Sequence, residues 1–344
     1  MDKKRKYDPF ASIIERAKGS TAKIVLPEGH DPRILEAANW AAENNLCKII
    51  LLGDKNLLAS KIRRKAQKNI TIIDPKSSGK TREMYAYSLF QLRKDKGMTE
   101  EKAMEALKDN LTFAMMMLKS EDADGIVAGA VRETADVLRG AFSIIKARPK
   151  ISKVSSVMLI EVPEGNKIGE NGILVFGDCA VNINPTDEEL ADTAILSAET
   201  AKTICNMRPN VALLGFTTKS HEDVDDEQTQ KIKRAYKIVR RKDPMLRIDG
   251  ELQGDAALSP LVAASKCRDS DVEGKANVLI FPDIMSGNIG YKLAQRVANT
   301  RAIGPILQGL NKPVNDLSRG TTAEEIIYNI AITVLQSKNT IKGS

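Results

Sequence analysis

The stretch KIVLPEGHDPRILEAANWAAENNLCKIILLGD, residues 23–54, decides the fold. It starts with a short apolar run at 23–27, continues with a helical pattern at 33–43 and ends with a second apolar run at 48–54. Strands that alternate with helices are typical of a parallel sheet covered by helices. The stretch therefore predicts an α/β fold.

The same alternation continues to about residue 146. Its next members are a strand at 70–74, two helical stretches between residues 82 and 119, a strand at 125–130 and a helix at 134–146. A first doubly wound unit closes at this point. The polar segment RPKISK at 148–153 contains Pro149, and we expect it to cross between two domains.

Beyond this crossing the pattern predicts a second sheet. The apolar runs KVSSVMLIEV and GILVFGDCAV are separated by PEGNKIGEN at 163–171. The Gly and Asn residues of that connection favour an antiparallel pair. Further strands, alternating with helices, are expected at 210–218, 246–253 and 277–283.

The order of these elements predicts two α/β domains. The first comprises residues 1–150 and, because the second unit occupies the middle of the chain, also the C-terminal stretch 308–344. The second comprises residues 151–307. Two such domains leave a cleft between them, which is a preferred place for ligands.

The composition favours a folded cytoplasmic protein with anionic ligands. The 344 residues include 52 Lys and Arg and 45 Asp and Glu, and the net charge of +7 is spread along the chain. Only 4% of residues are aromatic and the KKRK cluster at 3–6 is short, so nucleic acid is not expected as a partner. The cysteines show no CxxC spacing, which argues against zinc and disulfides. No apolar run approaches the ~20 residues that span a bilayer, and no signal-peptide core is found, so we expect no membrane association.

The segment NKPVNDLSRGTTAEEII at 311–327 carries most of the candidate chemistry. Ser318 is a hydroxyl donor, and Arg319 is a permanently charged fork that binds anions. Gly320 permits a sharp turn, and the helical pattern after it begins with an N-terminus that attracts anions. The segment therefore predicts an anionic substrate.

Glu325 has two candidate roles. In TAEE at 322–325 it completes a capping box, in which the Thr322 hydroxyl accepts from the third helical amide and Glu325 accepts from the cap amide. Alternatively, the same turn that places Ser318 places Glu325 as a catalytic base. The residues alone slightly favour the cap. If both roles exist, they are exchanged on substrate binding, or another carboxylate is the base.

Two further arginines have a structural and a functional explanation. Arg93 in LRKDKGMT lies near a predicted helix C-terminus, where the helix dipole alone favours a cation. Arg139 follows the strand at 125–130, and its alternative is a solvated surface arginine. Both also lie near the ends of predicted elements, where ligands of open α/β sheets bind.

The sequence contains no strong nucleotide motif. The turn SGNIGYKL at 286–293 resembles a phosphate-cradling turn, but its lysine is not at P-loop spacing. The segment PEGHDPR after the first strand has one glycine, so it lacks the dinucleotide fingerprint. A nicotinamide or ATP site is therefore not expected.

Nucleophilic catalysis has few candidates. His221 lies in an acidic polar stretch, and His30 can line a cleft but has no serine or cysteine elbow nearby. Cys179 is flanked by apolar residues and is expected to be buried and inert. Arginine, serine and carboxylate groups must therefore carry the chemistry.

Several motifs together resemble the phosphate acetyltransferase (phosphotransacetylase) family. They are, in chain order, LPEGHDPRILEAA, LRKDKGMTEEKA, AGAVRETADVLRGAF, FGDCAVNINPTDEELA, DGELQGDAAL, SGNIGYKLAQR and GPILQGLNKPVNDLSRG. The resemblance implies two isocitrate-dehydrogenase-like α/β domains, a homodimer and an active site in the interdomain cleft. It also implies transfer of an acetyl group between coenzyme A and phosphate, with CoA as a co-substrate and without a metal or bound cofactor.

The resemblance further implies which residues form the site. By position, the family's arginines correspond to Arg93, Arg139 and Arg319, its serine to Ser318, its carboxylate base to Glu325, and its substrate contacts to Thr134 and Asn288.

Three positions depart from the family pattern. Glu325 stands where aspartate is more common, and Gly254 stands where bulkier residues are usual. Glu133 precedes Thr134 where relatives have a small polar residue. A carboxylate there repels phosphate unless it points away or pairs with Arg132.

Direct acetyl transfer is the mechanism that this resemblance favours. Glu325 would take the thiol proton of CoA, Ser318 would donate to the developing negative charge, and Arg319 would hold the phosphate. Two alternatives stay open. One is a phosphate acyltransferase that prefers propionyl or butyryl groups, and the other is a non-catalytic protein that binds CoA or acetyl phosphate.

Overall fold

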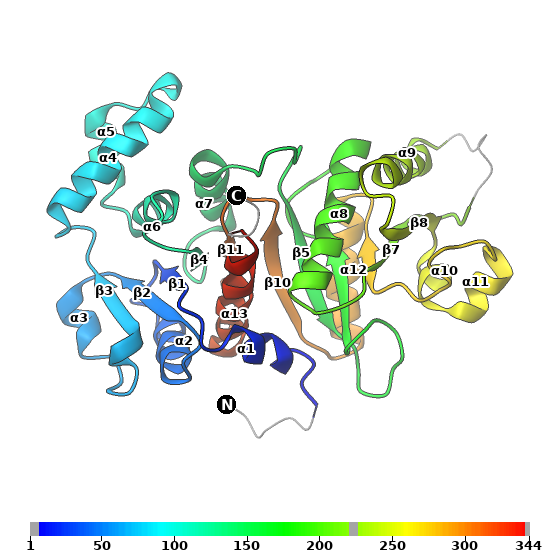
Figure 1. The fold of residues 1–344 in the computed structure, drawn as a ribbon, viewed down its shortest axis with the longest axis horizontal. Coiled ribbons are helices and arrows are strands. Elements are labelled where there is room, and N and C mark those ends of the chain that lie inside the picture. Colours follow the sequence, from blue (N-terminus) through cyan, green and yellow to red (C-terminus); the bar gives the residue numbers. More distant parts are fainter. Residues whose placement is uncertain (1–6, 220–225, 341–344) are drawn as a thin grey trace. The chain divides into compact units, whose positions relative to one another are not determined.

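The computed structural model describes residues 7–219 and 226–340, which form two compact units. The described residues of the two units are 13–148 with 310–340, and 7–12 with 149–219 and 226–309. Each unit has its own sheet and its own helices, so the predicted α/β class is confirmed (Figure 1). The limits predicted for the domains stay a prediction, because a compact unit is not the same as an independently folding one.

The first unit is built on a sheet of parallel strands. They are β1 (Lys23–Leu26), β2 (Lys48–Leu52), β3 (Ile70–Ile73), β4 (Gly125–Ala128) and β11 (Val314–Asp316). Their order is β11-β4-β1-β2-β3, so β11 lies at an edge beside β4. The β-branched and apolar runs explain the first four strands, which were predicted. β11 was not predicted, because Asn315 and Asp316 are unfavourable in strands.

Helices connect and cover these strands. They are α1 (Ala11–Ala17), α2 (Pro32–Glu43), α3 (Lys55–Ala59), α4 (Gly79–Arg93), α5 (Glu100–Ala106), α6 (Asn110–Lys119), α7 (Thr134–Gly140) and α13 (Ala323–Thr340). α2 begins with Pro32 after Asp31, whose carboxylate accepts from the Arg33 amide. α13 packs against α2 and β4, while α7 packs against β11.

The expected pair of helical stretches between residues 82 and 119 is in fact three helices, α4, α5 and α6. Gly97, at a φ of 79°, turns the chain after α4. Thr99 and Asp109 then cap α5 and α6 with their side-chain oxygens. The helix expected at 134–146 is also shorter, since α7 ends at Gly140 and continues as a π-helical turn at Ala141–Ile145.

The second unit has a mixed sheet. Its strands are β5 (Ser155–Glu161), β6 (Ile173–Gly177), β7 (Asn210–Leu214), β8 (Arg247–Leu252), β9 (Val278–Ile280) and β10 (Ala302–Gln308), in the order β10-β5-β6-β9-β7-β8. β5 and β6 pair antiparallel, which confirms the predicted hairpin, and β10 adds a further antiparallel strand that was not predicted. The other pairs are parallel.

Helices in the described part of this unit accompany its sheet. They are α8 (Asp187–Thr203), α9 (Glu227–Lys242), α10 (Gly254–Leu258), α11 (Pro260–Lys266) and α12 (Ile284–Val297). α8 opens with a capping box formed by Thr186 and Glu189. None of the helices in the described part of the chain is long and apolar enough to cross a membrane.

Candidate active site

Four candidate residues lie on the segments that follow the carboxyl ends of two strands in the first unit. Thr134 and Arg139 follow β4, and Ser318 and Arg319 follow β11, which is the direct neighbour of β4. Parallel neighbouring strands end at the same edge of a sheet, so the two loops meet there. Residues that are far apart in the chain are thereby brought to one place.

The loop after β4 is held by a buried carboxylate, Glu28. Its Oε2 accepts from the amides of Gly129 and Ala130 at 3.0 and 2.8 Å, and its Oε1 accepts from the amides of Val131 and Arg132 at 2.9 and 2.8 Å. Glu28 follows β1 and is 3% exposed. Its four charge-assisted hydrogen bonds fix the backbone just before Thr134.

Arg33 connects this loop to the turn after β11. Its Nη2 donates to the carbonyl of Ala130 at 2.8 Å, while Nη1 donates to the carbonyls of Arg319 and Thr321 at 2.8 and 3.0 Å. Asp31 orients the guanidinium through bonds to Nε and Nη2. The Arg33 guanidinium in turn holds the pKa of Asp31 below its usual range, because the ion pair favours the charged carboxylate.

The turn itself begins at Ser318. The Ser318 carbonyl accepts from the Thr321 amide at 2.9 Å, and its Oγ accepts from the Gly320 amide at 3.3 Å. The side chains of Ser318 and Arg319 are exposed. The Arg319 guanidinium makes no hydrogen bond or ion pair with another residue in the described part of the chain, so its charge is available to an anion.

Glu325 caps α13, as the sequence favoured. Its Oε2 accepts from the Thr322 amide at 2.8 Å, and the Thr322 hydroxyl accepts from the Glu325 amide at 3.2 Å. The Thr321 hydroxyl also donates to Oε2, at 3.0 Å. The other carboxylate oxygen, Oε1, receives no hydrogen bond from any residue that the structure describes. Capping therefore uses one oxygen only.

A second carboxyl group, Asp316, lies at the end of β11 behind this turn. It is 1% exposed, and its Oδ2 accepts from the Thr134 hydroxyl at 2.7 Å. Burial raises the pKa of Asp316 to about 6, and the negative charge of Glu28 adds to the rise, whereas the Thr134 hydroxyl and the Leu317 amide oppose it. A Cβ atom at Gly129 would collide with Oδ1, so glycine is required there.

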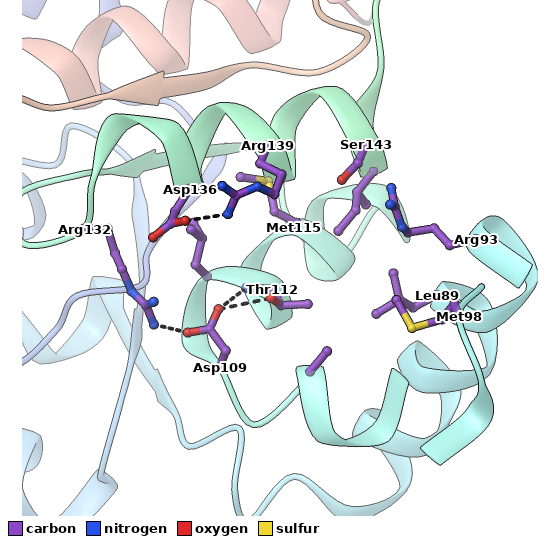
Figure 2. Close-up of a pocket in the computed structure, with 14 residues that line it drawn as sticks. Leu89, Arg93, Met98, Asp109, Thr112, Met115, Arg132, Asp136, Arg139 and Ser143 are labelled. Carbon is purple, nitrogen blue, oxygen red and sulfur yellow. Dashed lines mark hydrogen bonds and ion pairs between the residues drawn. The ribbon is translucent and has the colours of Figure 1, made fainter. Parts of the chain in front are cut away.

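A cavity of about 300 Å³ lies beside these loops and contains three arginines (Figure 2). Arg93, Arg132 and Arg139 surround it, with apolar surface from Leu89, Met98 and Met115 between them. Such a lining suits a ligand with separated anionic groups and an apolar part. The predicted residues Arg93 and Arg139 are thus brought to one cavity.

The three arginines differ in how they are paired. Arg139 donates to Asp136 at 2.7 Å, and Arg132 pairs with Asp109, as Figure 2 shows. Arg93 makes no side-chain hydrogen bond or ion pair within the described ranges. Glu133 is exposed, and Arg132 does not pair with it. Arg93 is therefore the most readily available cation of this cavity.

The remaining candidates are on other elements or are not described. Asn288 is on α12 of the second unit, where its Nδ2 donates to the Cys179 carbonyl at 3.0 Å. Cys179 is fully buried, as predicted, and burial raises its pKa well above the ordinary value. His30 lines a cavity of about 250 Å³ with Arg132. The KKRK cluster at 3–6 and His221 lie outside the described residues.

The site also contains residues that the sequence did not indicate, namely Glu28, Arg33 and Asp316. A charged residue at the end of a buried strand is a signal for Glu28 and Asp316, whereas Arg33, at the start of α2, has no such signal. The partners of all three are remote in the chain. No group of three or more His, Cys, Asp or Glu side chains among the described residues could hold a metal. An α/β fold that gathers arginines, a serine and carboxylates at one edge of a sheet is suited to an enzyme that acts on anions.

Known proteins resemble this chain over nearly its whole length. Residues 10–334 match the family described as phosphate acetyl/butaryl transferase. The phosphate acetyltransferase of Thermoanaerobacterium thermosaccharolyticum is 49% identical, over 95% of this chain and 98% of that protein. That of Clostridium acetobutylicum is 47% identical, over 97% and 100% of the two chains. The crystal structure of a phosphotransacetylase from Streptococcus pyogenes is 42% identical and superposes with a TM-score of 0.87, covering 97% of this chain and 98% of that one.

The chain therefore belongs to the phosphate acetyl/butyryl transferase family. The resemblance seen in its motifs is confirmed, and so is the acyltransferase class.

Proposed function

We propose that this protein transfers an acetyl group between coenzyme A and inorganic phosphate, interconverting acetyl-CoA and acetyl phosphate. The observation that carries the proposal is the turn at Ser318 and Arg319, which exposes a hydroxyl and an available guanidinium on adjacent residues. Arg33 holds this turn through the carbonyls of Arg319 and Thr321. The hydroxyl and the guanidinium suit a phosphate and a developing oxyanion. The relatives named above, at up to 49% identity, favour acetyl over longer acyl groups.

The proposed mechanism is direct transfer in a ternary complex. Glu325 accepts the proton of the CoA thiol, and the thiolate attacks the acetyl carbonyl of acetyl phosphate. Ser318 donates to the oxygen that becomes negative, and Arg319 stabilises the departing phosphate. Because the helix cap uses only Oε2 of Glu325, its Oε1 can take the proton while the cap stays formed. Glu325 can therefore act as helix cap and as catalytic base at the same time, without exchanging one role for the other.

The experiment that tests the function is arsenate-dependent release of free thiol from acetyl-CoA. Arsenate replaces phosphate, and its acyl product hydrolyses, so the release of CoA continues. Acetyl-CoA is expected to react faster than propionyl-CoA or butyryl-CoA. Fastest release from butyryl-CoA would instead identify a butyryl transferase, and no release from any of the three would leave only a binding protein.

We propose that the cavity with Arg93 and Arg139 receives the phosphate groups of CoA, while Thr134 contributes to the acetyl phosphate site. Asn288, on α12 of the second unit, is proposed as a further substrate contact. CoA carries several phosphate charges, and the three arginines of the cavity provide cations at separate points. CoA then acts as a co-substrate, and the reaction uses no bound cofactor or metal.

Arg93→Gln tests the CoA assignment. We expect the KM for CoA to rise roughly 10- to 100-fold, the range for loss of one charge-assisted contact, while the KM for acetyl phosphate changes little. Initial rates with each substrate varied in turn measure both constants. Lys94→Gln is the matched control, because this exposed neighbour loses the same charge outside the cavity. Equal increases in both KM values would place Arg93 elsewhere.

We also propose a homodimer in the cytoplasm, with α12 as part of the subunit contact. Met285, Ile289, Leu293 and Val297 are all more than half exposed and recur every four residues along this helix. Such spacing places them on one face, and a contiguous apolar face marks an interaction surface. A second copy of the chain would cover it.

Leu293→Asp tests the dimer. The parent protein is expected to elute with twice the 37.7 kDa mass of one chain, and the variant with the mass of one chain, because the charge cannot be buried in an apolar contact. Light scattering coupled to size exclusion gives the mass. Met245→Asp is the control, since Met245 is exposed but lies between α9 and β8. A Leu293→Asp variant that stays dimeric would exclude this face.

A further inference from the structure

Asp316 is a buried carboxyl group for which the proposed mechanism has no use. Its Oδ2 accepts from the Thr134 hydroxyl, and its Oδ1 is buried without a hydrogen-bond partner among the described residues. An ionised carboxylate in such a place loses hydration that is only partly replaced, by the Thr134 hydroxyl and the Leu317 amide. The geometry therefore suits a neutral carboxylic acid better than an anion.

The bond between Asp316 and Thr134 links the interior to the surface. Asp316 is buried at the end of β11, two residues before Ser318, whereas Thr134 is exposed at the start of α7, which follows β4. A hydroxyl has one proton to donate and two lone pairs that accept. The direction of the hydrogen bond between Asp316 and Thr134 therefore decides what Thr134 offers to a ligand.

We propose that Asp316 is a positioning residue that, in its neutral form, donates its proton to the Thr134 hydroxyl and so turns the Thr134 proton toward an oxygen of a phosphate ligand. When Asp316 is ionised, Thr134 donates inward and presents only lone pairs, which repel an oxyanion. This inference rests on the proposed function, in which Thr134 contacts phosphate. It adds that phosphate or acetyl phosphate binds together with a proton held on Asp316.

The charges around Asp316 favour this arrangement. Glu28, at the end of β1, is the charged group that acts on it most directly, and its negative charge favours the neutral acid. On the packed helices, α7 carries Asp136 and Arg139, which pair with each other, and α13 begins with Glu324 and Glu325. β4 has no charged residue. The pKa of Asp316, raised to about 6, then places its ionisation within the working range of most enzymes.

The expected effect is a pH dependence of ligand binding. Near pH 7 about one molecule in ten would have a neutral Asp316, and each further pH unit lowers that fraction about tenfold. The apparent affinity falls with the fraction of competent protein. In the parent protein, the KM for acetyl phosphate is therefore expected to rise roughly tenfold per pH unit between pH 7 and pH 8.5.

Asp316→Asn is the decisive variant, because its amide can donate to Thr134 at every pH. Its KM for acetyl phosphate should stay flat over the interval in which that of the parent rises. The ratio of the two proteins cancels ionisation of the substrates themselves. In Thr134→Val the KM for acetyl phosphate should likewise no longer rise with pH. In Thr134→Ser, which keeps the hydroxyl, the KM should rise with pH as in the parent. Parallel pH profiles of the parent and Asp316→Asn would overturn the inference.

Calorimetry with inorganic phosphate separates this inference from the proposed function. At pH 7, in two buffers of different ionisation enthalpy, the parent is expected to take up nearly one proton more per bound phosphate than Asp316→Asn. If acetyl transfer is absent but this difference is found, the inference holds and the proposed function fails. If transfer occurs and the proton uptake is equal, only the inference fails. Absence of both results overturns both.

The stability of Asp316→Asn shows whether the variant folds. Since the pKa of Asp316 is raised in the folded protein, the folded state binds this proton more tightly than the unfolded chain does. The parent therefore loses stability as the pH rises from about 4 to about 6 and does not regain that contribution above it. Asparagine avoids this loss, so the variant is expected to melt at or above the parent temperature at pH 8.

Discussion

Replacing Glu325 by glutamine is expected to lower the turnover of acetyl transfer about 10²- to 10⁴-fold, the range for loss of a general base. The glutamine oxygen still accepts from the Thr322 amide, so the cap of α13 remains and the melting temperature should fall by only a few degrees. Saturating initial rates of thiol consumption and differential scanning calorimetry measure the two quantities. A large loss of turnover without a comparable loss of stability would identify a base rather than a cap.

The pH dependence of the same variant sharpens the test. A thiol with a pKa near 8.5 is largely ionised by pH 9, so the need for a base decreases there. The difference in turnover between the parent and Glu325→Gln should therefore become smaller as the pH rises. Glu324→Gln removes the same charge from the exposed neighbouring residue and should react like the parent. If Glu325→Gln retains turnover within a few-fold of the parent, the proton acceptor lies elsewhere.

Replacing Arg33 by methionine is expected to reduce turnover by roughly 10²-fold although Arg33 is not proposed to touch substrate, because a displacement of about 1 Å in a reacting group has that cost. Arg33 joins the carbonyls of Ala130, Arg319 and Thr321. Its removal should also lower the free energy of unfolding by about 2–4 kcal/mol, since charge-assisted hydrogen bonds to partly buried groups are lost. Initial rates and urea unfolding measure these effects.

A control variant and the pH dependence of stability show whether the effect of Arg33→Met is specific to the site. Arg64→Met changes an exposed arginine outside the site and is expected to alter unfolding by less than about 0.5 kcal/mol. The pKa of Asp31, lowered by Arg33, contributes stability that is present above its ordinary value and is lost as the pH falls through the lower folded value. The stability gap between parent and Arg33→Met should therefore narrow in acid. Full turnover in Arg33→Met would show that the turn after β11 holds its geometry without this residue.

The fold could be predicted where local pattern and burial agree. β1 and β2 are β-branched or aliphatic runs whose inner residues are buried, and the sequence signal for them is strong. β11 is buried as well, but its residues Val314–Asp316 include two polar side chains that satisfy tertiary contacts, so no local pattern marks it. The split into α4, α5 and α6 depends on Gly97 and two caps, which are easily read as positions within longer helices.

The site could be predicted where one short segment contains the groups. Ser318, Arg319 and the capping box with Glu325 lie within eight residues and were recognised together. Glu28 and Arg33 were not recognised as site residues, because their hydrogen-bond partners are 101 and 286 positions away in the chain. Asp316 was not recognised in the sequence for another reason. Its character comes from burial and from the contact with Thr134, neither of which a single sequence reveals.

The carboxylate of Glu28 has a consequence for the resting protein. A run of four amides that point to one place would ordinarily receive a free anion from solution. Here the chain supplies its own anion, permanently attached, so the loop is already held in one shape before any substrate arrives. Substrate binding then does not have to order this part of the backbone, and incoming phosphate is directed to side chains that can release it again.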